Sequence, residues 1–168
     1  MKIRTLSVIA ILSVQLLFTS FAYSQNSEPN LKSRFGDWRL FNHSIGDENY
    51  CYISSAPIKQ HPTDKQWKPS FFIARFDGEY NQPSLYADYV FKEDSIVTIK
   101  ILNSTFMMAT DNNRAWLISQ DEEEKLVEAM KKGYQMVIQG TSKFDTETTD
   151  TYSLKGVTRS IQELDDGC

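Results

Sequence analysis

The chain contains two histidines, His43 and His61, and histidine is the commonest general base and metal ligand near neutral pH. A zinc site needs three or four nitrogen, sulfur or oxygen ligands at close spacing, and neither histidine has such neighbours in the sequence. A Gly-x-Ser-x-Gly nucleophile elbow is also absent from the sequence. We therefore expect a protein that is not an enzyme and that has no catalytic residue, no metal and no cofactor.

The segment between Pro57 and Pro69 is the candidate binding loop. It is long for a connection in a compact domain, it is basic in an acidic chain, and it contains a tryptophan. Aromatic and cationic side chains on a loop are typical of interaction surfaces, here for an anionic or carbohydrate-bearing partner. The alternative is that the tryptophan packs on the edge of the domain while the lysines keep the loop soluble. The candidate binding residues are Lys59, His61, Lys65, Trp67 and Lys68.

Residues 1–24 have the pattern of a secretory signal peptide. Lys2 and Arg4 precede an apolar run over Leu6–Phe21, and small residues then flank a cleavage point before Gln25. The alternative is an uncleaved membrane anchor, but a span needs about 20 apolar residues and this run is shorter and interrupted. We expect a periplasmic or secreted protein with no membrane span after cleavage.

The cysteine count and the charge restrict the chemistry further. Cys51 and Cys168 are the two cysteines, and an even number in an exported chain predicts a disulfide, which has a single intramolecular pairing here. A nucleophilic or metal-binding cysteine is the alternative, although neither has a close histidine and no CxxC is present. The formal net charge of −4 argues against nucleic-acid binding, which needs a basic face.

Alternating apolar and polar residues predict a mainly β fold of about nine short antiparallel strands joined by hairpin turns. Short strands at regular spacing with turn signals are typical of a sandwich or barrel. We expect a flexible leader over residues 25–34 and a single β-sandwich domain over residues 35–168. The predicted strands are Phe35–Phe41, Asn49–Ser55, Ser70–Phe76, Ser84–Phe91, Ile96–Leu102, Thr105–Ala109, Arg114–Ile118, Tyr134–Thr141 and Thr148–Leu154.

One helix is predicted within this pattern. Ser119 is a suitable N-cap with Glu122 three residues later, acidic residues follow it, and Gly133 ends the segment after two lysines. A short helical turn is expected near the C-terminus, because Val157 and Ile161 are spaced as on one helical face.

Several blocks together resemble the invasion-associated locus B family of exported bacterial proteins. The matching blocks cover nearly all of residues 35–168, and they are Gly36-Asp37-Trp38, Cys51-Tyr52-Ile53, Ala115-Trp116-Leu117, Ala129-Met130-Lys131-Lys132-Gly133, Thr149-Asp150-Thr151-Tyr152-Ser153-Leu154-Lys155-Gly156 and the terminal Cys168. The resemblance implies an immunoglobulin-like β-sandwich in the periplasm, outside the cell or at the envelope. The resemblance implies no catalytic residues for this chain. Many members have a further cysteine soon after Gly-Asp-Trp, where this chain has Arg39 to Asn42.

We assign five residues of these blocks to a structural motif: Trp38, Trp116, Asp150, Tyr152 and Gly156. The ring of Tyr152 is expected in the core with its hydroxyl bonded to a turn, and Gly156 is expected to allow a tight exit from the strand. The alternative is that the block around Asp150 and Tyr152 is a functional site.

Together these features favour an exported, non-catalytic binding module whose partner is an unknown protein or component of the bacterial envelope. The alternative is a structural or chaperone-like envelope component that holds another exported protein along its β-edges. An unrecognised enzyme is the third possibility. The sequence indicates no oligomeric state.

Overall fold

The computed structural model describes residues 29–45, 48–76 and 80–167. These residues form a mainly β fold with a single eleven-stranded antiparallel sheet, in the order β1-β2-β3-β5-β6-β9-β8-β7-β10-β11-β4. The elements are β1 (Asn30–Phe35), β2 (Trp38–Ile45), β3 (Glu48–Ser55), β4 (Lys59–His61), β5 (Ser70–Phe76), β6 (Tyr80–Tyr86), β7 (Ile96–Ile101), β8 (Ser104–Asp111), β9 (Arg114–Trp116), α1 (Gln120–Lys132), β10 (Gln135–Thr141), β11 (Glu147–Ser153) and α2 (Val157–Asp165).

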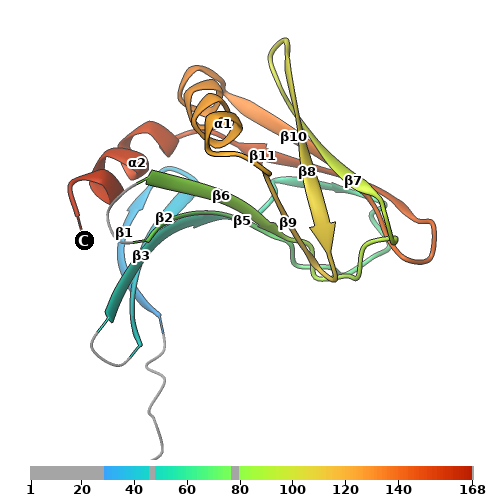
Figure 1. Ribbon diagram of the computed structural model, residues 1–168, viewed down its shortest axis with the longest axis horizontal. Coiled ribbons are helices and arrows are strands. Elements are labelled where there is room, and N and C mark those ends of the chain that lie inside the picture. The colour runs from blue at the N-terminus through green and yellow to red at the C-terminus, as the bar shows by residue number, and fades with distance from the viewer. Residues whose placement is uncertain (1–28, 46–47, 77–79, 168) are drawn as a thin grey trace, which may run out of the picture.

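The sheet bends so that its two halves pack against each other as in a sandwich. Phe71 of β5 contacts Trp38 of β2 and Tyr152 of β11, with ring centroids 6.4 and 6.2 Å away. Figure 1 shows α2 at one end of the molecule and the turn between β10 and β11 at the other. The predicted mainly β, sandwich-like fold is confirmed, with eleven strands in the described residues where about nine were expected.

The core lies between the two halves of the sheet and the two helices. Strand residues enter it at alternate positions, as the period of two requires. Helix α1 packs on β6, and α2 packs on β2 and β3. The largest fully buried side chains are Trp38, Tyr152, Phe71, Ile53, Ile73, Ile99, Ile101, Met108, Leu126, Met130, Met136 and Ile161.

Both predicted helices are present. Ser119 caps α1 and accepts a hydrogen bond from the backbone N–H of Glu122 at 3.4 Å, and the N–H of Gly133 bonds the carbonyl of Ala129 at the other end. The closing turn is a nine-residue helix, which Gly156 precedes.

Four segments differ from the sequence-based prediction. The strand predicted over Phe35–Phe41 is divided by the turn at Gly36 and Asp37, so that Phe35 ends β1 and Trp38 begins β2. Residues 30–34, expected in a flexible leader, belong to β1, an edge strand whose largely exposed side chains carry no apolar alternation. Residues 59–61, expected in a loop, form β4 on the opposite edge. The strand predicted over Ser84–Phe91 ends at Tyr86, although Ala87 and Phe91 still point into the core and continue the alternation.

Two tight turns join the start of the domain to its end. The backbone N–H of Asp37 donates to the carbonyl of Lys155 at 3.0 Å, and Trp38 Nε1 donates to the carbonyl of Ser153, also at 3.0 Å. Gly36 and Gly156 have φ of +58° and +92°, and a Cβ on either would lie within 2.3 Å of a backbone oxygen of the opposite turn. Only glycine accommodates this approach.

Candidate functional site

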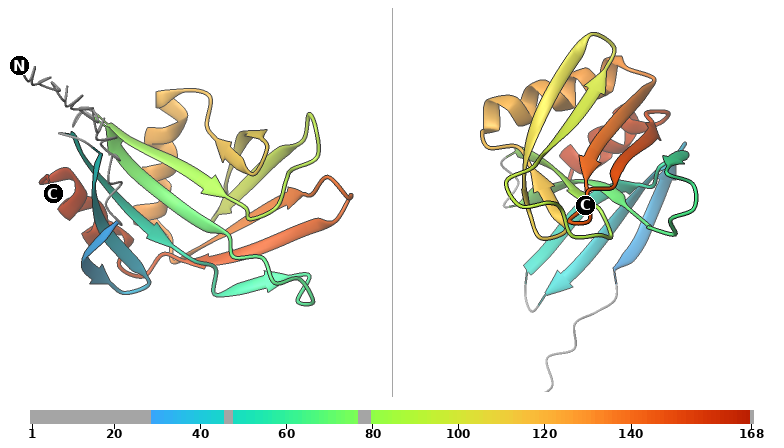
Figure 2. Two further views of the ribbon diagram at one scale, coloured as in Figure 1. Left: turned by 90° about the horizontal axis from the view of Figure 1, so that it is seen from below. Right: turned by 90° about the vertical axis from the view of Figure 1, so that its right-hand side faces the viewer.

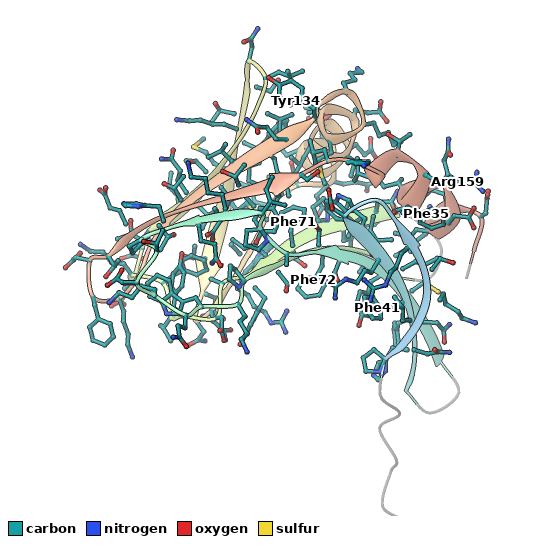
Figure 3. All side chains as sticks on the ribbon, turned by 180° about the vertical axis from the view of Figure 1, so that it is seen from behind. Phe35, Phe41, Phe71, Phe72, Tyr134 and Arg159 are labelled. Atoms are coloured by element: carbon teal, nitrogen blue, oxygen red, sulfur yellow. The ribbon has the colours of Figure 1, made fainter. Side chains whose placement is uncertain are left out.

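Strand β5 is apolar on both faces. Phe71 and Ile73 are fully buried in the core, whereas Phe72 and Ala74 are half-buried on the opposite, outer face. Figure 3 shows Phe71 and Phe72 on opposite sides of the strand, with Phe41 on the side of Phe72. An antiparallel sheet with one solvated face usually carries polar residues there, so this outer face is unusual.

The outer face contains a hollow of about 450 Å³, here called the aromatic hollow. Register places Phe72 beside Ser84 of β6, and Ser84 beside Trp116 of β9. Tyr52 of β3 lies edge-on to Phe72 with ring centroids 5.9 Å apart, and Phe41 stacks on Tyr52 at 5.2 Å. The hollow is lined by Tyr52, Phe72, Ala74, Gln82, Pro83, Ser84, Arg114, Trp116 and Glu123.

Polar groups from three elements reach the aromatic hollow. Gln82 comes from β6, Arg114 from β9 and Glu123 from the first turn of α1. The guanidinium of Arg114 lies 5.8 Å from the centroid of the Tyr86 ring. Burial raises the pKa of Glu123, and the neighbouring Glu124 carboxylate raises it further. Among the described residues neither Arg114 nor Glu123 forms an ion pair, so both have capacity for a ligand.

A second cluster of polar groups lies inside the sandwich on β11. Asp150 is only 6% exposed, and its burial raises the pKa of the carboxyl to about 6 despite a hydrogen bond from Gln60. The hydroxyls of Tyr89 and Thr148 are hydrogen-bonded at 2.7 Å. Tyr152 is fully buried, but its hydroxyl has no hydrogen-bond partner among the described residues. The expected bond from Tyr152 to a turn is therefore a wrong prediction: the hydroxyl is buried near Asp150 and Tyr89 and bonds neither of them.

The candidate binding loop lies elsewhere on the molecule. Strand β4 pairs with Thr149–Thr151 of β11, and Figure 2 shows β4 beside β11 at the sheet edge. Trp67 is half-buried with its ring 4.6 Å from that of Tyr89, so it packs on the edge of the domain. None of the five predicted loop residues lines the aromatic hollow; the other four, Lys59, His61, Lys65 and Lys68, are exposed.

The five residues assigned to the structural motif occupy different environments. Trp38, Tyr152 and Asp150 are buried, and Gly156 forms the tight turn before α2. Trp116 is 40% exposed and lines the aromatic hollow. Its side chain therefore contributes to a surface more than to the core.

The predicted disulfide involves Cys168, which lies outside the described residues. Cys51 of β3 is half-buried beside Arg75 of β5 in the sheet register. Arg75 is ion-paired with Asp165 near the end of α2 at 2.5 Å. This contact brings the C-terminal part of the chain close to β3, and the pairing of Cys51 with Cys168 stays a prediction. The signal peptide also lies outside the described residues.

The described residues contain two helices, α1 and α2. Neither helix in this part of the chain is long and apolar enough to cross a membrane. Within the same residues, no three His, Cys, Asp or Glu side chains gather in a way that suits a metal ion.

Sequence reasoning did not identify the aromatic hollow. The available signal was the run Phe71-Phe72-Ile73-Ala74, since four consecutive apolar residues in an antiparallel strand make both faces apolar. The contributions of Tyr52 and Glu123 had no comparable signal, because strand register and helix placement bring them to the site.

The fold is similar to that of a known bacterial protein. The crystal structure of invasion associated protein B from Bartonella henselae matches with a TM-score of 0.61 and 10% sequence identity, over 80% of this chain and 95% of that chain. No model of a protein family matches the sequence, and no curated protein matches it either. The similarity shows a shared fold.

Proposed function

We propose that this protein is an exported, non-catalytic binding module of the bacterial cell envelope, of the invasion-associated locus B type, and that it binds its partner at the aromatic hollow. The observation that carries the proposal is the exposure of Trp116, which lines the same hollow as the half-buried rings of Phe72 and Tyr52 on the outer face of the sheet. Exposed aromatic clusters with nearby arginine are typical of recognition surfaces. The leader over residues 1–24 supports export.

The edges of the sheet are poorly suited to holding another chain, which disfavours the chaperone-like alternative. Strand β4 has only three residues and lies between Pro57 and Pro62. Strand β1 carries Lys32 and Arg34, both exposed. Short edge strands, prolines and lysines are the usual features that prevent strand addition. The face of the sheet is therefore the better binding surface.

The test compares Trp116→Ala with Trp67→Ala in crosslinking to partners in the envelope. We expect Trp116→Ala to reduce recovery of the crosslinked partner at least tenfold, because aromatic anchors cost about 2 kcal/mol or more when truncated. Trp67→Ala should leave recovery unchanged, although it should lower the melting temperature more, since Trp67 packs on Tyr89.

Thermal melts of both variants provide the control for folding. If Trp116→Ala keeps its partner while Trp67→Ala loses it, the binding surface is the loop over residues 57–69 and the assignment to the aromatic hollow is wrong. N-terminal sequencing of the exported protein checks the cleavage before Gln25.

A further inference from the structure

We propose that the ligand of the aromatic hollow is a short, neutral saccharide. This inference rests on the proposed function, because it names the ligand class of the same surface. Its basis is the alternation of aromatic rings with hydrogen-bonding side chains along adjacent strands.

The lining matches the two kinds of surface that a sugar ring presents. A pyranose has faces of C–H groups, which pack on aromatic rings such as Phe72 and Trp116, and a periphery of hydroxyl groups. Gln82, Ser84 and Arg114 lie among the rings and supply donors and acceptors for those hydroxyls.

An aliphatic ligand would match the apolar part of the lining but not its polar groups. It would cover Gln82, Arg114 and Glu123 without offering a hydrogen bond to any of them. Burying an unpaired polar group costs about 1–3 kcal/mol, and more for a charged one. A saccharide satisfies these groups and still covers the rings.

The charges of the hollow point to a neutral ligand. Arg114 of β9 and Glu123 of α1 are the charged residues in the lining, and their charges are opposite. A polyanion would be repelled by Glu123 and a polycation by Arg114, whereas neutral hydroxyls can donate to the carboxylate and accept from the guanidinium.

The dimensions indicate a disaccharide or trisaccharide. The volume of about 450 Å³ lies in the range of about 300–1,000 Å³ that is usual for small-ligand sites. Strands β5, β6 and β9 are adjacent, so Phe72 and Trp116 are separated by two interstrand spacings of about 4.8 Å each. Tyr52 on β3 extends the row by one more strand.

The experiment is a titration of the full exported protein with two neutral trisaccharides, cellotriose and tri-N-acetylchitotriose. Calorimetry and tryptophan fluorescence measure the binding. We expect saturable binding of at least one of them and a loss of at least tenfold in affinity in Trp116→Ala. Ser84→Lys should have the same effect by filling the hollow between Phe72 and Trp116. Trp67→Ala is the matched tryptophan control and should bind as the unmodified protein does.

Melting temperatures show whether Trp116→Ala and Ser84→Lys remain folded, and either variant alone suffices for the test. If neither trisaccharide shows saturable binding up to about 10 mM, the proposal of a saccharide ligand is wrong. Concentration-dependent self-association that Trp116→Ala abolishes also overturns it, since the occupant is then a second copy of the chain. In either case, the proposed function still stands if Trp116→Ala reduces recovery of the crosslinked envelope partner. If recovery of that partner is unchanged in Trp116→Ala, both the saccharide proposal and the proposed function are wrong.

Discussion

Asp150 is a carboxyl that the fold keeps largely away from water. Its ordinary pKa of 3.8 rises to about 6 in the folded protein because of burial, and the hydrogen bond from Gln60 only partly opposes this. Between these two pH values the folded state holds a proton that the unfolded state has lost. The free energy of unfolding therefore decreases as pH rises from about 4 to about 6, and the ionised carboxylate destabilises the fold above that range.

This predicts a pH-dependent gain in stability from Asp150→Asn. The amide keeps the shape of the side chain and a hydrogen-bonding group but cannot ionise, so the variant should gain about 1 kcal/mol over the unmodified protein at pH 7.5, allowing for solvent screening. At pH 4 the gain should vanish. Urea denaturation at both pH values measures the difference.

Glu147→Gln is the matched control, because it makes the same change of acid to amide at an exposed position of the same strand. It should show no such pH-dependent gain. A gain from Asp150→Asn that is equal at pH 4 and pH 7.5 would mean that folding does not shift the pKa of the Asp150 carboxyl, which contradicts the prediction.

At the scale of elements, the two glycine turns hold the first hairpin to the end of β11. Gly156 has φ of +92°, and a Cβ there would lie 2.0 Å from the carbonyl oxygen of Phe35. Gly156→Ala should therefore cost about 3 kcal/mol of unfolding free energy, because it combines a left-handed conformation with a backbone clash. Chemical denaturation measures this cost.

Gly167→Ala separates the cost of the left-handed conformation from the cost of the backbone clash. Gly167 also has a positive φ, +86°, but nothing lies within 4 Å of where its Cβ would be. Its substitution should cost only the conformational strain, about 1 kcal/mol. Equal costs at the two positions would show that the contact between the turns contributes little.

The sequence predicts elements well where local signals coincide with the fold. Strand β5 and the N-cap of α1 were both predicted, because turn residues and capping chemistry act locally. Strands β1 and β4 were missed because they are edge strands with little buried surface, and they form by pairing with β2 and β11. The strand predicted over Ser84–Phe91 was too long, because Ala87 and Phe91 are buried in the core although they lie beyond the end of β6.

The aromatic hollow is a property of the whole molecule, which explains why the sequence did not predict it. Tyr52, Phe72 and Trp116 are far apart along the chain and become neighbours only through the register of β3, β5, β6 and β9. Glu123 joins them because α1 packs on β6. By contrast, the buried positions of Trp38 and Tyr152 follow from blocks that are recognisable in the sequence.

The last prediction concerns closure of the whole domain by Cys51 and Cys168. The ion pair of Arg75 with Asp165 shows that the end of α2 reaches the strand next to Cys51. A bond between the two cysteines would close a loop of more than about 100 residues, which is worth up to about 4.7 kcal/mol through the unfolded state. We expect the double variant Cys51→Ser/Cys168→Ser to lose several kcal/mol of unfolding free energy.

Asp165→Asn provides the comparison, because it removes a partly exposed ion pair with Arg75 and weakens the hydrogen bond that the carboxylate accepts from Asn81. It should cost about 1 kcal/mol. Denaturation under non-reducing conditions measures both changes, and thiol titration of the denatured, unreduced protein should detect no free thiol. Two free thiols in protein isolated from the periplasm would contradict the disulfide. In that case the packing of α2 against β2 and β3 would have to hold the C-terminus without a covalent bond.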